Sequence, residues 1–231
     1  MFNFFRKKEI PLSEIDYNFY YTNDKIKDIS LTNHQIGLLN VTSGKIVVCD
    51  PLVSLGYVEH LNRMIEPGKY PVVICIANHD SFWERYSLAK MVIREEVATK
   101  WELAYTKSSE KEVLKLKKWE FFGFPVDTGL GCFCDFDTQN LYNKFDDDFM
   151  SKNDDTNIYD GYFAERFKEN ATDKNNPSDA WNWLNWEVPD TKNNVIMFNS
   201  WFGDWFYPTY WGLNENNEVV SLLIDFLVFD Q

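Results

Sequence analysis

Residues 71–77 read PVVICIA, a run in which β-branched and apolar side chains occupy both faces of an extended chain. A strand with two apolar faces is covered on both sides, so the pattern is typical of the middle of a sheet. The turn signal Pro67-Gly68 stands just before it. We therefore predict a buried central strand at 71–77, with the rest of the fold arranged around it.

Strand patterns continue on both sides of this segment. Residues 34–50 predict a hairpin that turns at 42–44, whereas residues 82–94 fit either a helix or a strand. Apolar residues alternate over 101–105 and favour a second hairpin that turns near Val97. The segments expected to form one sheet are 34–50, 71–77, 99–106, 195–199 and 207–228, and residues 214–217 predict a turn between two strands of the last segment.

The middle of the chain changes to a helical period. A capping-box signature predicts a helix over 109–119, and apolar residues four apart predict a second helix over 138–150. Residues 158–168 predict a third helix. Segment 171–193 is rich in Asn, Asp and Pro, so we expect a loop around a short Trp-rich turn.

Strands at both ends of the chain with helices between them predict the α+β class. We expect one domain over 1–231, on a mainly antiparallel sheet with three or so helices inserted in the middle of the chain. Residues 1–33 are expected to be an N-terminal extension packed on that domain. The 9 Trp, 12 Tyr and 19 Phe residues can fill a sizeable core.

Charge limits the partners. The chain has 36 acidic and 23 basic side chains, a formal net charge of −13. Lys and Arg supply the affinity for a phosphate backbone, so we expect no nucleic-acid partner, and an anionic membrane surface is disfavoured. No run approaches the ~18 apolar residues of a membrane span. A protein partner with a basic surface fits this charge best.

The four cysteines are interpreted as reduced thiols, and three of them lie in apolar stretches. The first residues, MFNFFRKK, place their charges after a short apolar run, which is the reverse of a secretion signal. These features predict a cytoplasmic protein without disulfides. The cysteines are Cys49, Cys75, Cys132 and Cys134.

Two short patterns suggest chemistry. The triplet DTG at 127–129 matches the aspartic-protease signature, but it occurs once, and a turn whose aspartate holds backbone N–H groups is favoured. The pair HD at 79–80 could assemble a metal site with Cys132 and Cys134. A loop histidine and two strand cysteines are the favoured interpretation, so we expect no metal and no cofactor.

Residues 135–160 contain eight aspartates and two lysines. Their spacing is not that of an EF-hand, so a solvated acidic face is favoured over an ion site. Such a face would steer a cationic partner, and exposed tryptophans could anchor it, although core packing is the favoured role for most of the tryptophans. The candidate binding residues are Asp146, Asp147, Asp148, Trp181, Trp183 and Trp186.

Several blocks together point to a family. They are SGKIVVCDPL at 43–52, PGKYPV at 67–72, WELA at 101–104, VDTGLGCFCD at 126–135, GD at 203–204, YPTYWGL at 207–213 and DF at 225–226. In this order, over about 36–228, they resemble the bacterial domain-of-unknown-function 4241 family. The resemblance implies family membership and no established activity.

Charge and motifs favour a non-enzymatic binding module, an immunity-type inhibitor of a basic protein or toxin. The alternative is a carboxylate-based hydrolase, with or without a metal, that uses Asp127, Asp135 and Asp204. We expect instead that most of these aspartates, with Asp50 and Asp225, bind turn N–H groups and lie scattered. The sequence leaves the oligomeric state open.

Overall fold

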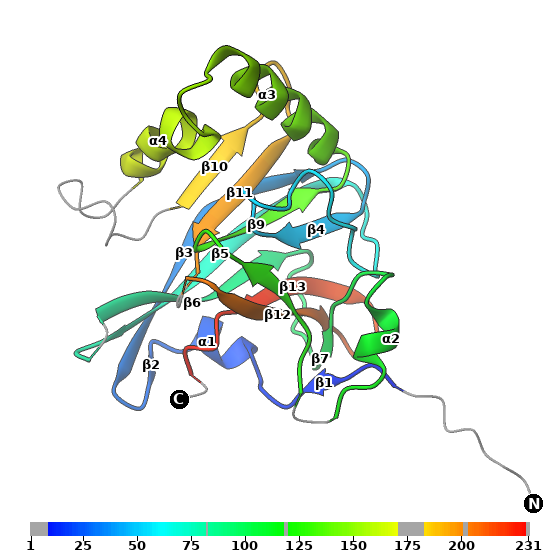
Figure 1. Cartoon of the computed structure of the whole chain (residues 1–231). Coiled ribbons are helices and arrows are strands. Elements are labelled where there is room, and N and C mark those ends of the chain that lie inside the picture. The colour runs from blue at the N-terminus through cyan, green and yellow to red at the C-terminus, as the bar shows by residue number, and fades with distance from the viewer. Residues whose placement is uncertain (1–8, 82, 118–119, 171–182, 201–202, 230–231) are drawn as a thin grey trace, which may run out of the picture.

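Two antiparallel sheets and a layer of helices make up the protein (Figure 1). The computed structural model describes residues 9–81, 83–117, 120–170, 183–200 and 203–229. In spatial order the larger sheet contains β1 (Leu12–Ser13), β7 (Lys100–Leu103), β12 (Trp205–Leu213), β13 (Val219–Asp225), β6 (Trp83–Val92), β5 (Gly68–His79), β3 (Ile29–Val41) and β2 (Lys25–Ile26), and β8 (Gly123–Val126) pairs with β12.

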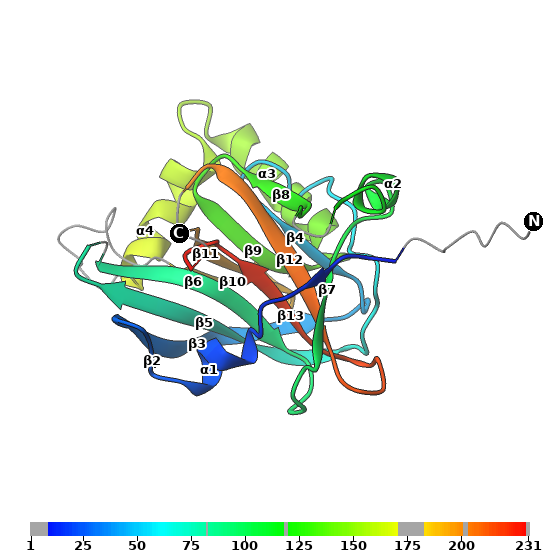
Figure 2. The ribbon, with the colours of Figure 1, turned by 90° about the horizontal axis from the view of Figure 1, so that it is seen from below.

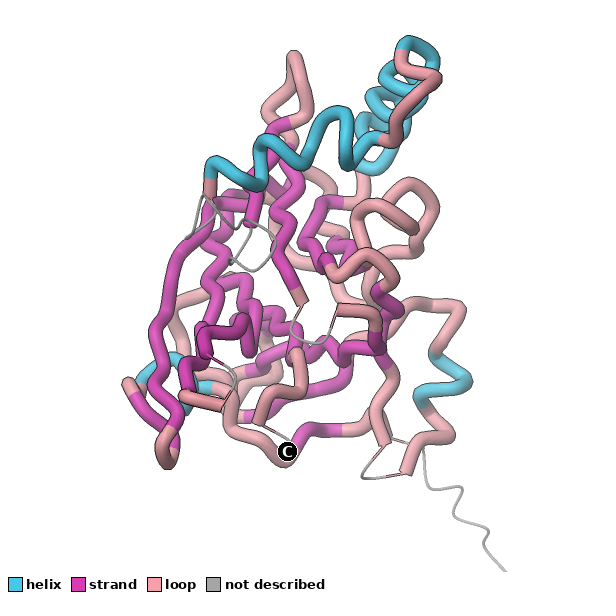
Figure 3. The backbone as a smooth tube through the Cα atoms, turned by 60° about the vertical axis from the view of Figure 1, so that its left-hand side comes forward, coloured by secondary structure: helices cyan, strands magenta, loops and turns pink. Residues whose placement is uncertain are grey.

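The smaller sheet has the order β10 (Trp183–Glu187), β11 (Asn194–Asn199), β9 (Leu130–Asp135) and β4 (Ile46–Cys49). Figure 3 shows most of the helical chain gathered at one end of the molecule. The helical elements are α1 (Asn18–Thr22), α2 (Glu110–Val113), α3 (Thr138–Lys152), the π-helical turn η1 (Tyr159–Phe163) and α4 (Ala164–Glu169). The α+β class with antiparallel sheets and mid-chain helices is confirmed.

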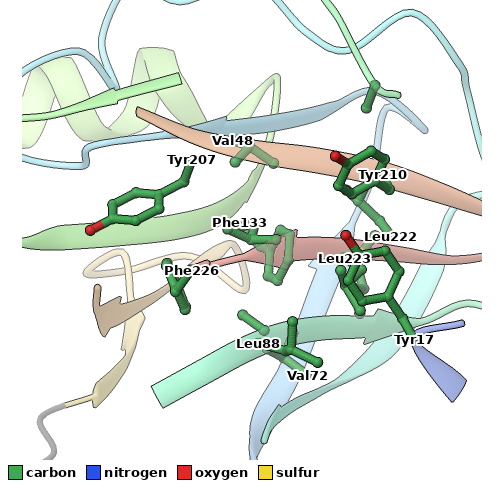
Figure 4. Packing of buried hydrophobic residues seen from close by; sticks show 14 of the residues in the cluster. Tyr17, Val48, Val72, Leu88, Phe133, Tyr207, Tyr210, Leu222, Leu223 and Phe226 are labelled. Atoms are coloured by element: carbon green, nitrogen blue, oxygen red, sulfur yellow. The ribbon is translucent and has the colours of Figure 1, made fainter. Parts of the chain in front are cut away.

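The smaller sheet lies between the larger sheet and the helices, and its side chains point alternately to the two layers. Val48 and Phe133 point toward the larger sheet, where Figure 4 shows them in one cluster with side chains that include Leu222. The alternate residues, such as Cys132 and Met197, pack under the helices. Two apolar clusters therefore share one sheet, and the three layers form a single domain.

The predicted central strand is confirmed. β5 lies between β3 and β6, and Ile74 and Cys75 are fully buried. The C-terminal hairpin of β12 and β13 is also present, with a turn that the Asn214 side chain closes by accepting the N–H groups of Asn216 and Glu218. In these two segments the apolar pattern and the turn residues predict the strands correctly.

The prediction of one sheet is wrong, and so is the hairpin over 34–50. β3 pairs with β5, whereas β4 pairs with β9 in the other sheet. The chain changes sheets at Gly44, whose φ of 76° favours glycine. A side chain there would also clash with the Ile65 carbonyl, so the turn separates two sheets instead of closing a hairpin.

Three further expectations need correction. β6 and β7 do not form a hairpin, because β6 pairs with β13 and β7 pairs with β12. The helix expected over 109–119 has its α-helical part at 110–113 only. The loop expected over 171–193 contains β10, and its part at 171–182 lies outside the described residues.

The edge of β12 carries two strands in succession (Figure 2). β7 pairs with β12 up to Leu103, the Ala104 N–H donates to the Thr209 carbonyl at 2.7 Å, and Gly123 then pairs with Pro208. β8 thus takes over where β7 ends. Residues 105–122, which we call the lysine insert, leave the sheet at this point and return to it.

The N-terminal segment covers the outer face of the larger sheet. β1 pairs with β7, and α1 places Tyr17 and Tyr20 in the larger core cluster. The four cysteines are buried with free thiols, and Cys49 Sγ lies 3.7 Å from Cys132 Sγ. In the described part of the chain, no helix is long and apolar enough to cross a membrane.

Candidate functional site

Asp50 joins the end of β4 to the loop between β8 and β9. Its carboxylate is buried and accepts the N–H groups of Asp127 at 2.9 Å and Thr128 at 2.8 Å. The Thr128 hydroxyl donates to both of its oxygens, and the Leu52 N–H donates to Oδ1 at 3.0 Å. This carboxylate therefore fixes the loop that carries Asp127.

Asp135 holds the chain at the other end of β9. Its side chain is fully buried and accepts five hydrogen bonds. The N–H and hydroxyl groups of Thr42 and Ser43 supply four of them, at 2.8 to 3.1 Å, and the Asp137 N–H supplies the fifth at 3.1 Å. The carboxylate thus accepts most of its hydrogen bonds from the turn at 42–44, where the chain passes from one sheet to the other.

Asp225 fastens the N-terminal segment to the larger sheet. It accepts the Tyr17 hydroxyl at 2.8 Å and the Leu227 N–H at 2.8 Å. Burial raises the pKa of Tyr17, and the charge of Asp225 raises it further. The hydroxyl therefore stays protonated and available as a donor.

The expected role of the aspartates is confirmed for Asp50, Asp135 and Asp225, each of which binds backbone N–H groups. They are also scattered. Five residue steps along β9, at about 3.3 Å each, put about 17 Å between its two ends. Across the described residues, no group of three or more His, Cys, Asp and Glu side chains is placed to hold a metal.

Two of the three candidate catalytic aspartates do come together. Val126 pairs with Trp205, so Asp127 and Asp204 are the next residues on the two chains. Both side chains are exposed. Asp135 lies at the far end of β9 with its oxygens occupied, so the three residues do not form one catalytic group.

His79 lies at the tip of the β5–β6 hairpin and makes a Ser–His–Asp chain. Nδ1 lies 2.7 Å from the Ser81 hydroxyl, and Nε2 lies 2.8 Å from Asp28 Oδ2. The Ser81 N–H also points at Nδ1 at 3.2 Å, as in a local turn. The Asp28 side chain is 73% exposed, so water competes with these contacts and the arrangement serves to close the hairpin.

The acidic residues gather on the outer side of the helices. Residues 137–170, here called the acidic helical layer, contain nine acidic and four basic side chains, a net charge of −5. Asp147 and Asp148 are exposed, and Asp148 pairs with Lys152 at 2.7 Å. Partial burial raises the pKa of Asp146, and the charge of Asp147 raises it further.

The two described tryptophans of those predicted to accompany these aspartates, Trp183 and Trp186, are not exposed anchors. Trp186 is only 3% exposed and packs against Phe145 and Phe163, with ring centroids 5.0 and 5.2 Å apart. Trp183 is half-buried on the same strand, β10. Trp181 lies outside the described residues. A binding role for Trp186 is therefore wrong, because the side chain belongs to the core.

An apolar cavity of about 470 Å³ opens beside β8 and was missed by sequence reasoning. Its walls are residues 104–106, residues 121–125, Phe206 and the chain near Val58. We call it the aromatic cavity. Phe121 and Phe206 remain substantially exposed at its rim. The aromatic residues within 121–124 are evident in the sequence. The cavity, however, depends on how the chain between β7 and β8 leaves the sheet, which the sequence does not predict.

Lys90 is a second feature that the sequence did not reveal. It lies on the face of β6 that α1 covers, with Nζ 3.4 Å from the centre of the Tyr21 ring. Burial lowers the pKa of Lys90 to about 8. Within the described residues no carboxylate forms an ion pair with it, and its neighbours include the Tyr21 ring and the Cys75 thiol.

A family model described as "Protein of unknown function (DUF4241)" matches residues 39–224, about four fifths of the chain. The chain belongs to the DUF4241 family. The match runs from the end of β3 to β13 and includes Asp50, Asp135, the aromatic cavity and the acidic helical layer. Neither the curated proteins nor the solved structures gave a match. For this DUF4241 protein, function is therefore argued from its own geometry.

Proposed function

We propose that this DUF4241 protein is a non-enzymatic binding module of the immunity type, which holds a basic protein against the acidic helical layer. The observation that carries the proposal is the excess of exposed carboxylates on the outer side of α3, η1 and α4. Charge of one sign on a single face speeds the encounter with a partner of opposite charge and selects against acidic competitors.

The carboxylates of this layer repel one another. Asp147, Asp154 and Asp155 are exposed and form no ion pair with any described residue. Partial burial raises the pKa of Asp146, and the neighbouring charge of Asp147 raises it further, as expected for carboxylates that repel one another. A cationic partner relieves this repulsion, which is an interaction gained only on binding.

The alternative function, a carboxylate-based hydrolase, has support from the neighbouring positions of Asp127 and Asp204 alone. The carboxylates of Asp50 and Asp135 already accept hydrogen bonds from turn N–H groups. The binding proposal therefore explains more of the charged residues, and it requires no catalytic role for the motif aspartates.

The test uses two triple variants with the same change in charge. Asp146, Asp147 and Asp148 are replaced by Asn in the first. Glu66, Glu95 and Glu215, which are exposed and lie on loops of the larger sheet, are replaced by Gln in the second. Wild type and both variants serve as baits in the native host, and the captured protein is then purified for association kinetics at two salt concentrations.

We expect a partner with a basic surface that binds wild type and the Gln variant. The Asn variant should associate about tenfold more slowly, with a weaker dependence on salt. An acidic partner, or equal association rates for the two variants, would refute the proposal. Hydrolysis of a substrate by wild type that is lost on replacing Asp127 and Asp204 by Asn would instead favour the hydrolase.

A further inference from the structure

The outer edge of β8 is one place where the larger sheet can accept another strand. β8 pairs with β12 on one side, and in the described part of the chain no strand pairs with its other side. β1 pairs with β7 at Trp101 and Glu102, and the Leu103 N–H donates to the Pro11 carbonyl at 2.9 Å.

The backbone groups of Phe124 and Val126 face β12, so those of Gly123 and Pro125 face outward. Because proline has no N–H, this edge offers an extended peptide the Gly123 N–H and the C=O groups of Gly123 and Pro125.

The aromatic cavity lies along this edge and has the size of a ligand site. Its volume of about 470 Å³ falls within the usual range for pockets. Phe124 and Pro125 of β8 form one wall, Tyr105 and Thr106 form another, and Phe206 stands at the rim with 57% of its surface exposed. Such a cavity fits an aromatic or aliphatic side chain of a bound segment.

The lysine insert gives the neighbourhood a charge opposite to that of the whole molecule. Residues 105–122 contain five lysines and three glutamates, in a chain of net charge −13. Lys107 and Lys111 are exposed and form no ion pair with any described residue. Lys107 directly follows Thr106, which lines the aromatic cavity, so a positive charge stands beside this part of the edge.

From these three features we propose that β8 and the aromatic cavity bind an extended acidic peptide, which adds a strand to the larger sheet. Side chains of a strand alternate in direction. An apolar residue of the peptide fills the cavity, and the acidic residues next to it face Lys107 and Lys111. The site lies apart from the acidic helical layer and takes a ligand of opposite charge.

The probe is a short fluorescein-labelled peptide in which phenylalanine alternates with glutamate, added to the full chain and followed by fluorescence anisotropy. A second peptide carries lysine in place of each glutamate. Backbone amide shifts in an NMR spectrum report where the peptide lies. We expect saturable binding of the acidic peptide, weak binding of the basic one, and the largest shifts at the amides of Gly123, Phe124 and Val126.

Adjacent residues of β12 provide a matched pair of variants. Phe206 lines the cavity, whereas Trp205 does not, and both are 57% exposed. Phe206→Ala should weaken binding about tenfold, and Trp205→Ala should leave it unchanged. Both side chains are mostly in solvent, so the fold tolerates either change, which circular dichroism verifies.

A second pair of variants tests the charge. Lys107→Glu with Lys111→Glu should weaken binding of the acidic peptide about tenfold at low salt. The control is Lys69→Glu with Lys192→Glu, at exposed positions outside the lysine insert, and it should have a much smaller effect.

Four outcomes would overturn the proposal. The first is equal binding of the two peptides, and the second is equal loss for Phe206→Ala and Trp205→Ala. The third is a wild-type dimer that Phe206→Ala converts to a monomer, since a second copy would then fill the cavity. The fourth is tighter peptide binding after Phe4 and Phe5 are replaced by Ser, which would assign the cavity to the chain's own first residues.

Discussion

Asp135 at the end of β9 and Asp147 in α3 carry the same carboxylate, twelve residues apart, in opposite surroundings. Asp135 is fully buried and accepts five hydrogen bonds. Asp147 is exposed beside two further aspartates. A buried charge must be satisfied by the fold itself, whereas a surface charge is satisfied by water and remains available to a partner.

The contrast predicts its largest effect at Asp135. Asp135→Ala removes a buried acceptor and leaves three partly buried N–H groups and two hydroxyls without it, so we expect a loss of about 3 kcal/mol or more in the free energy of unfolding. Urea denaturation measures it. If this variant fails to fold, Ser43→Ala, which removes one donor, should cost about 1 kcal/mol. A smaller loss for Asp135→Ala than for Ser43→Ala would contradict the assigned role.

The sequence predicted the elements better than their partners. The strand at 71–77 and the hairpin after Tyr207 were correct, because apolar pattern and turn residues there act over short distances. The hairpin over 34–50 was wrong, because the partner of β4 is β9, far along the chain. Asp135 stabilises the turn at Thr42 through contacts across more than ninety residues, which no local pattern reveals.

The candidate site divides in the same way. The turn-binding role of Asp50 and Asp135 follows from their positions after strands, and the prediction was correct. The binding role predicted for Trp186 is wrong because the composition of 171–193 predicts a loop where the protein forms β10. Trp186 lies on the inner face of that strand and is therefore buried. The aromatic cavity could not be foreseen, because it depends on the insertion of residues 105–122 between two halves of one sheet edge.

Lys90 sharpens the comparison, because it is a mostly buried charge that no described carboxylate neutralises. Burial lowers its pKa from 10.5 to about 8, so the folded state binds fewer protons than the unfolded state between these values. Stability attributable to this group should therefore rise with pH from about 8 to about 10.5, and be lowest below pH 8. Lys90→Met removes the buried charge but also loses the contact with the Tyr21 ring. The net result at pH 7 should be a gain of about 1–2 kcal/mol in the free energy of unfolding.

The measurement is the difference in unfolding free energy between wild type and Lys90→Met at several pH values from 7 to 9.5. Taking the difference cancels the titration of the tyrosines and cysteines. The gain should shrink as pH rises, while Lys69→Met, at an exposed site on β5, should show no such trend. A gain that is independent of pH would mean that packing, and not charge, causes it.

The smallest effect on stability is expected where the effect on binding is expected to be largest. Replacing Asp146, Asp147 and Asp148 by Asn removes their mutual repulsion, which favours the fold, and also removes the exposed pair of Asp148 with Lys152, which opposes the gain. Exposed charges contribute only a few tenths of a kcal/mol each, so the net change should stay within about 0.5 kcal/mol and diminish in high salt.

The pKa of Asp146 is raised in the folded state, so the folded protein binds a proton at Asp146 more readily than the unfolded protein does. The free energy of unfolding therefore falls as pH rises and Asp146 loses that proton. The triple variant should therefore gain slightly on wild type at pH 7 and lose that gain in acid, where Asp146 is protonated. Urea denaturation at pH 7 and at pH 4 tests this. A loss of more than about 2 kcal/mol would show that these carboxylates hold the fold as Asp135 does, and the distinction between the two regions would fail.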